Sequence, residues 1–474
     1  MAFGSMVLLF GFLPLILLCY FLLPARWRGG RNAALLTGSL VFYAWGGVRL
    51  LPVLLASCVC NWALALLAAP GKPFFRRAAL AAALVGNLGM LGYFKYTGFL
   101  LDNLNALELQ ITVPAIALPA GISFFTFQAI AYVVDVYRGT IPAERNLGKV
   151  MLFMAFFPQL LQGPILRYGD LGPSLTNRRE TAADAAEGAV RFCFGLAKKV
   201  LLADALGQAA DVAFAAGGHL TVALAWLGGI AYTLQLYFDF SGYTDMAIGL
   251  GRVFGFRLPE NFNYPYIAKS ASEFWRRWHM TLSFWFRDYV YIPLGGNRCS
   301  RGRQIANLLV VWMLTGLWHG SAWNFVLWGL YYAALLMGEK FLWGGVLERL
   351  PSAFRHLYAL VLITIGWVLF RSASLSQVGE MVSAMLGFAP GGLWSGEAAY
   401  CLRQFAWEWA LAIPTALPLK AWIQARLETR RAAGSRGAAV LLVWGPKVLA
   451  FALLGCSVVR ILGAGVQSFL YFQF

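Results

Sequence analysis

Long segments without a charged side chain recur along this sequence and constrain its fold more than any other feature. They cover residues 2–25, 33–48, 50–71, 78–94, 109–134, 150–166, 212–238 and 304–338. Weaker spans lie near residues 357–370, 405–419 and 438–459. A transmembrane helix needs about 20 mostly apolar residues, and only 12% of these 474 residues are charged, against about 25% in soluble proteins. The sequence therefore predicts an all-α, polytopic integral membrane protein with roughly 9 to 12 transmembrane helices.

The chain carries neither an internal repeat nor a low-complexity linker that would divide it. Inverted repeats are typical of secondary transporters, so the lack of a detectable duplication argues against that class. We expect one membrane domain that covers residues 1–474.

The net charge of +17 would suggest a nucleic-acid partner for a soluble protein, but its distribution indicates a membrane instead. Lysine and arginine gather in short loops between the apolar segments, as the positive-inside rule describes for cytoplasmic loops. These loops contain Arg26, Arg28 and Arg31, then Lys72, Arg76 and Arg77, and finally Arg426, Arg430, Arg431 and Arg436. With these loops inside, the N-terminus and the C-terminal tail both lie on the outer face. We expect the lipid bilayer, and no nucleic acid, as the partner.

No motif for a metal site or for a soluble-enzyme active site is present. The seven cysteines are scattered without zinc-ligand spacing. P-loop, HExxH, Gly-x-Ser-x-Gly and kinase patterns do not occur. We expect no metal and no bound cofactor, so the functional candidates are polar residues in apolar surroundings.

The first candidate is His319, which interrupts the uncharged segment 304–338. That segment is too long for one crossing and short for two, so it predicts a helix, a turn at His319 and a second helix, with the turn inside the membrane. An ionisable residue at such a depth indicates a functional site. The alternative is a histidine that caps a helix at the membrane interface.

The second candidate is His279. It lies in a segment where Trp275, Trp278, Leu282, Trp285 and Tyr289 follow helical spacing. This periodicity predicts an amphipathic helix in or near the membrane surface. His279 is then either a surface imidazole or the partner of His319 in an acid–base pair, because histidine takes and returns a proton near neutral pH.

Two carboxylates, Asp239 and Asp245, end a long apolar segment around Ser241. Buried carboxylates need partners, and we expect these among Arg252, Arg257, Arg276 and Arg277. A structural ion pair and a catalytic role are both open. Asn261 belongs to a rigid connector at residues 259–266, rich in Asn, Pro and Tyr, that is expected to act as scaffold.

The chain ends in an uncharged aromatic tail, Phe469-Leu-Tyr-Phe-Gln-Phe474. It either lies along the bilayer, where aromatic belts are common, or enters an outer cavity and presents the hydroxyl of Tyr471.

Several of these strings resemble the membrane-bound O-acyltransferase family, in particular its bacterial branch of alginate O-acetyltransferases. The resemblance extends over essentially the whole chain. The strings are Leu236-Tyr-Phe-Asp-Phe-Ser-Gly-Tyr-Thr-Asp-Met-Ala-Ile-Gly249, Phe274-Trp-Arg-Arg-Trp-His-Met-Thr-Leu-Ser283, Phe286-Arg-Asp-Tyr289, Pro293-Leu-Gly-Gly-Asn-Arg298, Gly316-Leu-Trp-His-Gly320 and Tyr471-Phe-Gln-Phe474.

The resemblance implies that His319 is the essential active-site histidine and that His279 is its companion. It implies a ring of helices around a thin core with a central tunnel, a catalytic core at residues 239–338, an aromatic C-terminal tail at 461–474, and Tyr471 as acyl carrier. The residues expected to support the site or line the tunnel are Asp239, Ser241, Asp245, Asn261, Trp275, Arg276, Trp278, Trp318 and Trp323.

The implied activity is acetyl transfer from a cytoplasmic thioester, acetyl-CoA, across the bacterial inner membrane to an exported or cell-wall polysaccharide such as alginate or cellulose. His319 would be the general base, and His279 would orient or polarise the thioester. The expected partners are a periplasmic acetyltransferase of the SGNH type and other polysaccharide-modifying proteins. D-alanyl or peptidoglycan acyl transfer by a related branch, and a polysaccharide exporter or channel, are the alternatives.

Overall fold

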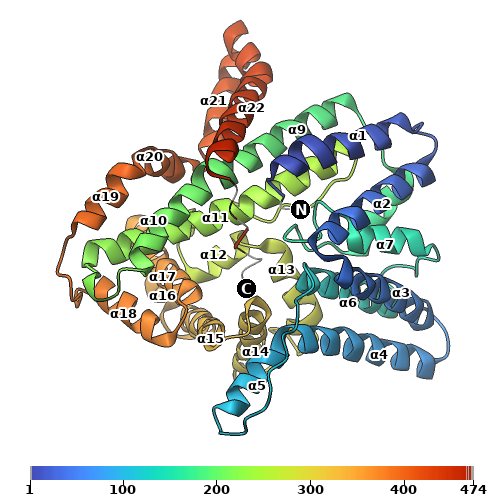
Figure 1. Cartoon of the computed structure of the whole chain (residues 1–474), viewed down its shortest axis with the longest axis horizontal. Helices are drawn as coiled ribbons and strands as arrows, with labels where there is room; N and C mark the ends of the chain where they lie inside the picture. The colour runs from blue at the N-terminus through green and yellow to red at the C-terminus, as the bar shows by residue number, and fades with distance from the viewer. Residues whose placement is uncertain (1–2, 466, 468, 471–474) are drawn as a thin grey trace. The chain divides into compact units, whose positions relative to one another are not determined.

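The computed structural model describes residues 3–465, 467, 469 and 470, and these form helices joined by loops without a β-strand (Figure 1). The prediction of an all-α, polytopic membrane protein is confirmed. In the described part of the chain, five helical stretches are long and apolar enough to cross a membrane: Arg28–Ala68, Pro73–Asn105, Trp323–Arg349, Ser352–Arg371 and Arg436–Gly463. The total of 9 to 12 crossings, the ring of helices and the tunnel stay predictions.

Some uncharged segments are interrupted by proline or by glycine. In segment 109–134, residues 109–121 are not helical, and helix α6 (Ile122–Arg138) begins only after Gly121. The φ of Gly121 is 71°, a conformation that suits a residue without a Cβ atom. The other interrupted segments are 150–166, helical only in α7 (Leu147–Ala155), 212–238, divided between α10 (Asp204–Phe214) and α11 (Val222–Val253), and 405–419, which holds the short α20 (Ala406–Thr415).

Polar caps determine where several helices begin. A side-chain oxygen accepts a hydrogen bond from the backbone N–H three residues later and so satisfies a donor that the first helical turn leaves unpaired. The caps are Asn146 before α7, Ser270 before α12 (Ala271–Arg277), Ser374 before α18 (Leu375–Met385), Ser395 before α19 (Gly396–Gln404) and Ser435 before α22 (Arg436–Ala464).

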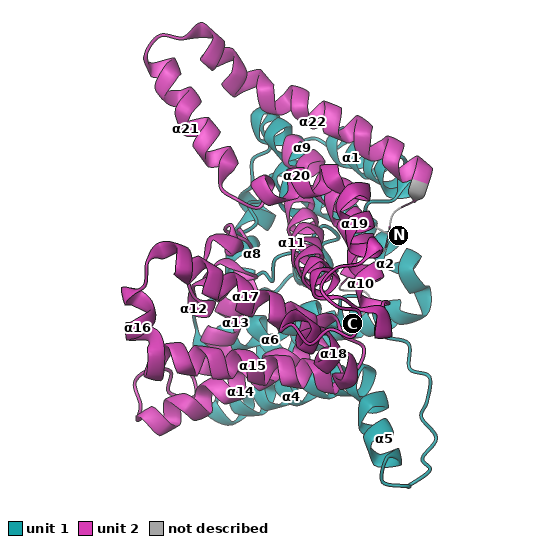
Figure 2. Ribbon diagram, turned by 90° about the vertical axis from the view of Figure 1, so that its left-hand side faces the viewer, with its two compact units in different colours: residues 1–189, 247–259 teal, residues 190–246, 260–474 magenta. Residues whose placement is uncertain are grey.

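The helices fall into two compact units (Figure 2). Unit 1 comprises Met1–Ala189 and Ala247–Pro259, and unit 2 comprises Val190–Met246 and Glu260–Phe474. Helices α9 (Ala182–Ala197) and α11 contribute to both. A division by contact density does not test independent folding, so the single domain remains a prediction.

Unit 1 is built around α6, which is buried along most of its length. Helix α3 packs against α4, α6 and α7, and α2 packs against α7. Besides α6 and α7, the helices of this unit are α1 (Leu13–Leu22), α2 (Arg28–Gly47), α3 (Leu51–Ala68), α4 (Pro73–Leu91), α5 (Thr97–Asn105) and α8 (Tyr168–Asn177).

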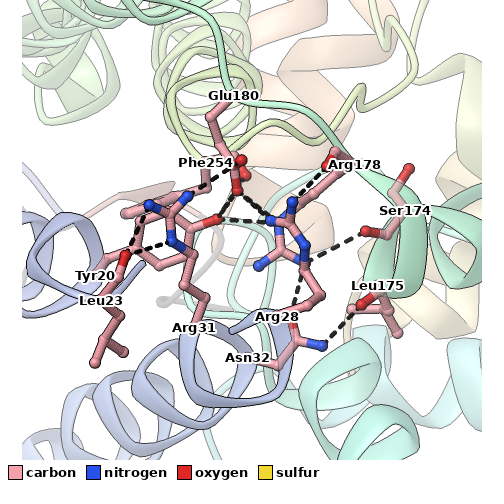
Figure 3. Close-up of polar contacts among 10 residues, drawn as sticks. All are labelled: Tyr20, Leu23, Arg28, Arg31, Asn32, Ser174, Leu175, Arg178, Glu180 and Phe254. Atoms are coloured by element: carbon pink, nitrogen blue, oxygen red, sulfur yellow. Dashed lines mark hydrogen bonds and ion pairs between the residues drawn. The ribbon is translucent and has the colours of Figure 1, made fainter. Parts of the chain in front are cut away.

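A buried cluster around Glu180 holds the first loop of unit 1 (Figure 3). Three arginines face this one carboxylate: Arg28, Arg31 at 3.2 Å and Arg178 at 3.4 Å. Tyr20 also donates its hydroxyl to Glu180. Burial by itself raises the pKa of Glu180, but the hydrogen bonds from Arg28 and Tyr20 and the charge of Arg28 outweigh it and hold the pKa at about 2.

Unit 2 contains the segment in which the two candidate histidines lie. Helix α14 packs most extensively on α15, α15 also packs on α17, and α12 contacts both α15 and α17. Helices α21 and α22 pair as a hairpin, visible in Figures 1 and 2. The helices not yet given bounds are α13 (Met280–Phe286), α14 (Arg301–His319), α15 (Trp323–Gly338), α16 (Gly344–Arg349), α17 (Ser352–Arg371) and α21 (Leu419–Ala432).

Candidate active site

His319 is the last residue of α14, and the short turn before α15 follows it, as the segment 304–338 predicts. Two glycines allow the helices to touch backbone to backbone. A Cβ atom on Gly316 would lie 2.3 Å from the carbonyl oxygen of Phe325, and one on Gly329 would lie 2.4 Å from that of Trp312. Small residues permit such close helix approaches in membranes. This contact fixes the end of α14 against the start of α15.

Aromatic rings surround the imidazole of His319, which is 5% exposed. The rings of Trp318 and Trp328 have their centroids 4.9 Å away, and that of Phe370 lies at 5.2 Å, all edge-to-face. The amide of Asn324 donates to the carbonyl of Ser372 at 3.0 Å and to that of Phe370 at 3.4 Å, which holds the end of α17 at this turn. His319 therefore sits in a packed apolar box.

His279 separates α12 from α13, so the continuous amphipathic helix predicted over residues 275–289 is wrong. Its backbone has φ 44° and ψ 52°, a left-handed conformation that ends one helix and begins the next. Main-chain hydrogen bonds tie this break to the connector: the N–H of Met280 donates to the carbonyl of Asn261 at 3.0 Å. His279 is 1% exposed and is not a surface imidazole.

The indole of Trp318 connects the two histidines. Its centroid lies 5.9 Å from that of His279 and 4.9 Å from that of His319. On α11, the ring of Phe240 meets His279 edge-to-face at 4.7 Å. Two buried imidazoles beside one aromatic ring form a site that can take up and return a proton in the absence of bulk water.

Of the other tryptophans expected at the site, two are buried and one is exposed. Trp275 is buried against Trp312 and Tyr332, both at 4.8 Å, and Trp278 is buried against Trp367 at 4.9 Å. These rings form the aromatic core behind the His279 break. In contrast, Trp323 is 56% exposed at the start of α15, and Arg276 is exposed and donates to its own helix at Ser272.

Asp239 belongs to a buried charged triad. The Nζ of Lys199 lies 2.6 Å from Asp239 and 2.7 Å from Asp204. The triad also holds the C-terminal segment, because Asp239 accepts a hydrogen bond from the N–H of Leu470 at 3.1 Å, and Lys199 lies 4.6 Å from the ring centre of Phe469. Pairing of this kind is what makes charges tolerable in an apolar interior.

Asp245 forms a second cluster, with Lys198 at 2.6 Å and Arg191 at 2.8 Å. Arg191 in turn binds Glu260 at 2.6 Å. The expected arginine partners of the two aspartates were therefore wrong. The correct partners are Arg191, near the middle of α9, and two lysines of the π-helix η4 (Lys198–Ala203), which a close approach of Gly195 to Gly242 brings against α11. Ser241 is buried between the two aspartates in sequence.

Several residues of this region did not emerge from the sequence. Lys199 and Asp204 belong to no motif, and the one signal for them is that a buried carboxylate such as Asp239 needs a cation as partner. Trp328 and Phe370 lie in apolar segments with many other aromatic residues, and no spacing distinguishes them. Tyr471 lies outside the described residues.

Comparison with known proteins identifies a family and several relatives. The sequence model of the membrane-bound O-acyltransferase family matches residues 144–370, which include both histidines. A protein of Azotobacter vinelandii named a probable alginate O-acetylase is 46% identical over 395 residues, 82% of this chain and 78% of that protein. A protein of the same name from Pseudomonas aeruginosa is 44% identical over 395 residues, covering 82% and 75%. The peptidoglycan O-acetyltransferase of Helicobacter pylori is 35% identical over 419 residues, covering 81% and 80%.

The matches cover most of both chains in each pair. The range matched by the family model contains α11, the break at His279 and the helix–turn–helix with His319. Matches of this extent exclude a chance similarity of apolar composition. The chain is a multi-pass membrane O-acyltransferase and belongs to the membrane-bound O-acyltransferase family.

Proposed function

We propose that this enzyme transfers an acetyl group from a thioester, acetyl-CoA, to a hydroxyl group, for the O-acetylation of an exported or cell-wall polysaccharide. The observation that carries the proposal is the pair of buried imidazoles, His279 and His319, in contact with the same Trp318 ring. The names of the relatives support acetyl as the group and a polysaccharide as the final acceptor, with alginate first among the candidates.

The reaction needs a group that moves one proton. The acceptor hydroxyl loses its proton as its oxygen attacks the thioester carbonyl, and the C–S bond then breaks and the thiolate becomes a thiol. General acid–base help in such a step contributes about 10²–10⁴-fold to the rate. His319 and His279 are the catalytic groups in this proposal, and the surrounding rings exclude water that would hydrolyse the thioester.

The proposed direction of transfer is outward across the bacterial inner membrane. The basic loops that contain Arg26, Arg76 and Arg426 favour a cytoplasmic position for these loops, which places the N-terminus and the C-terminal tail in the periplasm. Acetyl-CoA then enters from the cytoplasm, and a periplasmic acetyltransferase of the SGNH type, with other polysaccharide-modifying proteins, receives the group. Tyr471 is the proposed carrier. The hydrogen bond from Leu470 to Asp239 supports the carrier role, because it holds the residue directly before Tyr471 within unit 2.

Reconstituted protein tests the proposal directly. Full-length enzyme in liposomes is incubated with isotopically labelled acetyl-CoA, and covalent label is located by peptide mass spectrometry. We expect label on the Tyr471 peptide in the unaltered enzyme, and its loss in His319→Ala, His279→Ala and Tyr471→Phe. His219→Ala is the matched control, because His219 is exposed at the end of the short 3-10 helix Gly217–His219 before α11. Label that persists in Tyr471→Phe would contradict the carrier role alone.

The alternative activities give different results in the same system. A D-alanyl transferase leaves the protein unlabelled by acetyl-CoA and requires an alanyl thioester. A peptidoglycan acetyltransferase accepts the acetyl label but modifies peptidoglycan in cells. A polysaccharide exporter or channel would lose secretion of the whole polymer in His319→Gln, whereas the proposed enzyme loses only acetylation.

A further inference from the structure

The side-chain oxygen of Asn261 meets three donors. It lies 3.1 Å from Nδ1 of His279, 3.2 Å from the backbone N of Thr281 and 2.9 Å from Oγ1 of Thr281. The backbone N–H of Thr281 can only donate, so the amide atom facing it is the oxygen and not the nitrogen. An amide oxygen can only accept. The facing nitrogen of His279 must therefore carry a proton.

We propose that Asn261 is a positioning residue that holds His279 in the tautomer with its proton on Nδ1, and that His279 thereby acts as the proton acceptor of the transfer reaction. In this tautomer Nε2 carries the lone pair. The inference rests on the proposed function and assigns a role within it. An asparagine that orients a catalytic imidazole through Nδ1 is chemically comparable to the orienting residue of Cys-His-Asn proteases.

The structure holds this imidazole firmly. Asn261 is completely buried, and its main chain is tied to the same break through its carbonyl and the N–H of Met280. The connector is tied a second time, because the N–H of Asn263 donates to the carbonyl of Arg277 at 2.9 Å. The rings of Phe240 and Trp318 pack on the imidazole. Rotation of the ring by half a turn would place a carbon atom where Nδ1 now faces Asn261 and so lose this contact.

The proton balance of the step is complete. The hydroxyl proton passes to Nε2 of His279, and the hydroxyl oxygen forms a C–O bond with the thioester carbonyl carbon. The resulting imidazolium keeps its Nδ1–H on Asn261. As the C–S bond breaks, the released thiolate takes the proton back. The family resemblance implies His319 as the general base and His279 as the residue that orients or polarises the thioester. The proposed tautomer gives the base role to His279, because polarising the thioester through Nε2 would require a proton on that atom.

The charged groups near His279 are paired with one another. On α11, Asp239 is bound by Lys199, and Asp245 by Lys198 and Arg191. On the connector, Glu260 binds Arg191, and on α12, Glu273 and Arg277 pair at 2.9 Å while Arg276 is exposed. The other ionisable groups on the elements packed around this break include the tyrosines Tyr237, Tyr243, Tyr264 and Tyr266, Arg252 at the end of α11, Arg301 and Arg303 at the exposed start of α14, and His319 at its end. A change in the charge of residue 261 is therefore the most direct electrostatic perturbation of the imidazole.

The tautomer itself is measured first. Full-length enzyme with ¹⁵N-labelled histidine is studied in liposomes by solid-state NMR, and the chain's four histidines make assignment by single substitutions feasible. We expect protonated Nδ1 and unprotonated Nε2 for His279 at neutral pH, and loss of this preference in Asn261→Leu. A proton on Nε2 in the unaltered enzyme would overturn the proposal. This readout does not depend on which acyl group is transferred.

The pH profile of acetyl transfer then tests the role. Asn261→Asp keeps the shape and the acceptor oxygen but adds a negative charge that stabilises the imidazolium. If His279 must be neutral to accept a proton, the acid limb of the rate profile moves to higher pH. A limb that stays in place or moves to lower pH refutes the assignment. Thr281→Val is the matched control: it removes a donor from the same oxygen and should retain the tautomer and the profile. Thermal unfolding confirms that each variant is folded.

Discussion

The backbone N–H of Leu470 donates to a carboxylate oxygen of Asp239 at 3.1 Å, although 231 residues separate the two along the chain. The other oxygen of Asp239 lies 2.6 Å from Lys199. One side chain thus joins α11, the π-helix η4 and the C-terminal segment. The backbone of Leu470 is therefore held on a buried ion pair.

Lys199→Met should release the tail. The substitution leaves Asp204 and Asp239 buried without their cation, and removal of one partner from a buried pair costs about 3–5 kcal/mol. Hydrogen exchange of the C-terminal peptide should become faster, and the melting temperature should fall. Lys198→Met is the matched control because its partner, Asp245, has a second cation in Arg191. Equal exchange in both variants would show that the tail is held by other contacts.

Gly316→Ala should impair activity more than a helix substitution of the same size elsewhere. Its Cβ atom would lie 2.3 Å from a backbone oxygen of α15, so α14 must shift, at a cost of about 1–3 kcal/mol. Because His319 is one turn away, turnover should fall with stability. Gly302→Ala, near the start of the same helix with open space around it, should be neutral or slightly stabilising. The measurements are acetyl transfer and thermal unfolding of both variants.

Trp328→Leu should reduce turnover, whereas Trp323→Leu should change it little. Trp328 is completely buried against His319, and a displacement of a catalytic group by about 1 Å can lower the rate about 10²-fold. Trp323 is 56% exposed and serves as the control for loss of an indole in α15. Steady-state acetyl transfer separates the two variants. A comparable loss in Trp323→Leu would show that Trp323 also acts at the site, as expected from the sequence.

Glu180→Gln should destabilise unit 1 by about 3–5 kcal/mol near neutral pH, because three arginines lose their common carboxylate. Glu260→Gln is the control: the side chain of Glu260 is 56% exposed in its pair with Arg191, so the loss should be below about 1 kcal/mol. Thermal unfolding in detergent compares the variants.

The contribution of Glu180 to the free energy of unfolding should fall on acidification. Its pKa falls from an ordinary 4.5 to about 2 in the folded protein, so the folded state favours the ionised form. Its contribution is fully present above pH 4.5 and is lost as the pH falls toward 2. The difference in unfolding free energy between the unaltered protein and Glu180→Gln should stay constant above pH 4.5 and shrink as the pH falls from 4.5 toward 2. A difference that grows on acidification would contradict the assignment.

The sequence predicted those features that depend on local composition. The uncharged segment 304–338 indicated two helices and a turn at His319, because a charge-free run of that length has few other solutions. Proline and glycine explain why segment 109–134 becomes helical only at Ile122. The break at His279 was missed because the apolar periodicity continues across it. The left-handed backbone there depends on hydrogen bonds to Asn261, which no spacing of residues within α12 and α13 encodes.

The partners of the buried carboxylates could not be read from spacing either. Lys199 is 40 residues from Asp239, and Lys198 is 47 residues from Asp245. All four arginines first considered are nearer to the two aspartates in the sequence. Close packing of Gly195 on Gly242 selects the correct pairs, and that is a property of the fold. The box around His319 was missed for a similar reason, since Trp328 and Phe370 come from two different helices.

The order of the paired charges along the chain bears on how this protein enters the membrane during synthesis. Lys198 and Lys199 leave the ribosome before Asp239 and Asp245. An aspartate at the centre of an isolated helix raises the free energy of insertion by about 2.5–3.5 kcal/mol, so α11 is poorly suited to partition into lipid alone. We expect the translocon to retain α9 and η4 until α11 emerges, so that the cations neutralise the carboxylates before either helix meets the acyl chains. The helices around the site would then enter the membrane in pairs and not one at a time.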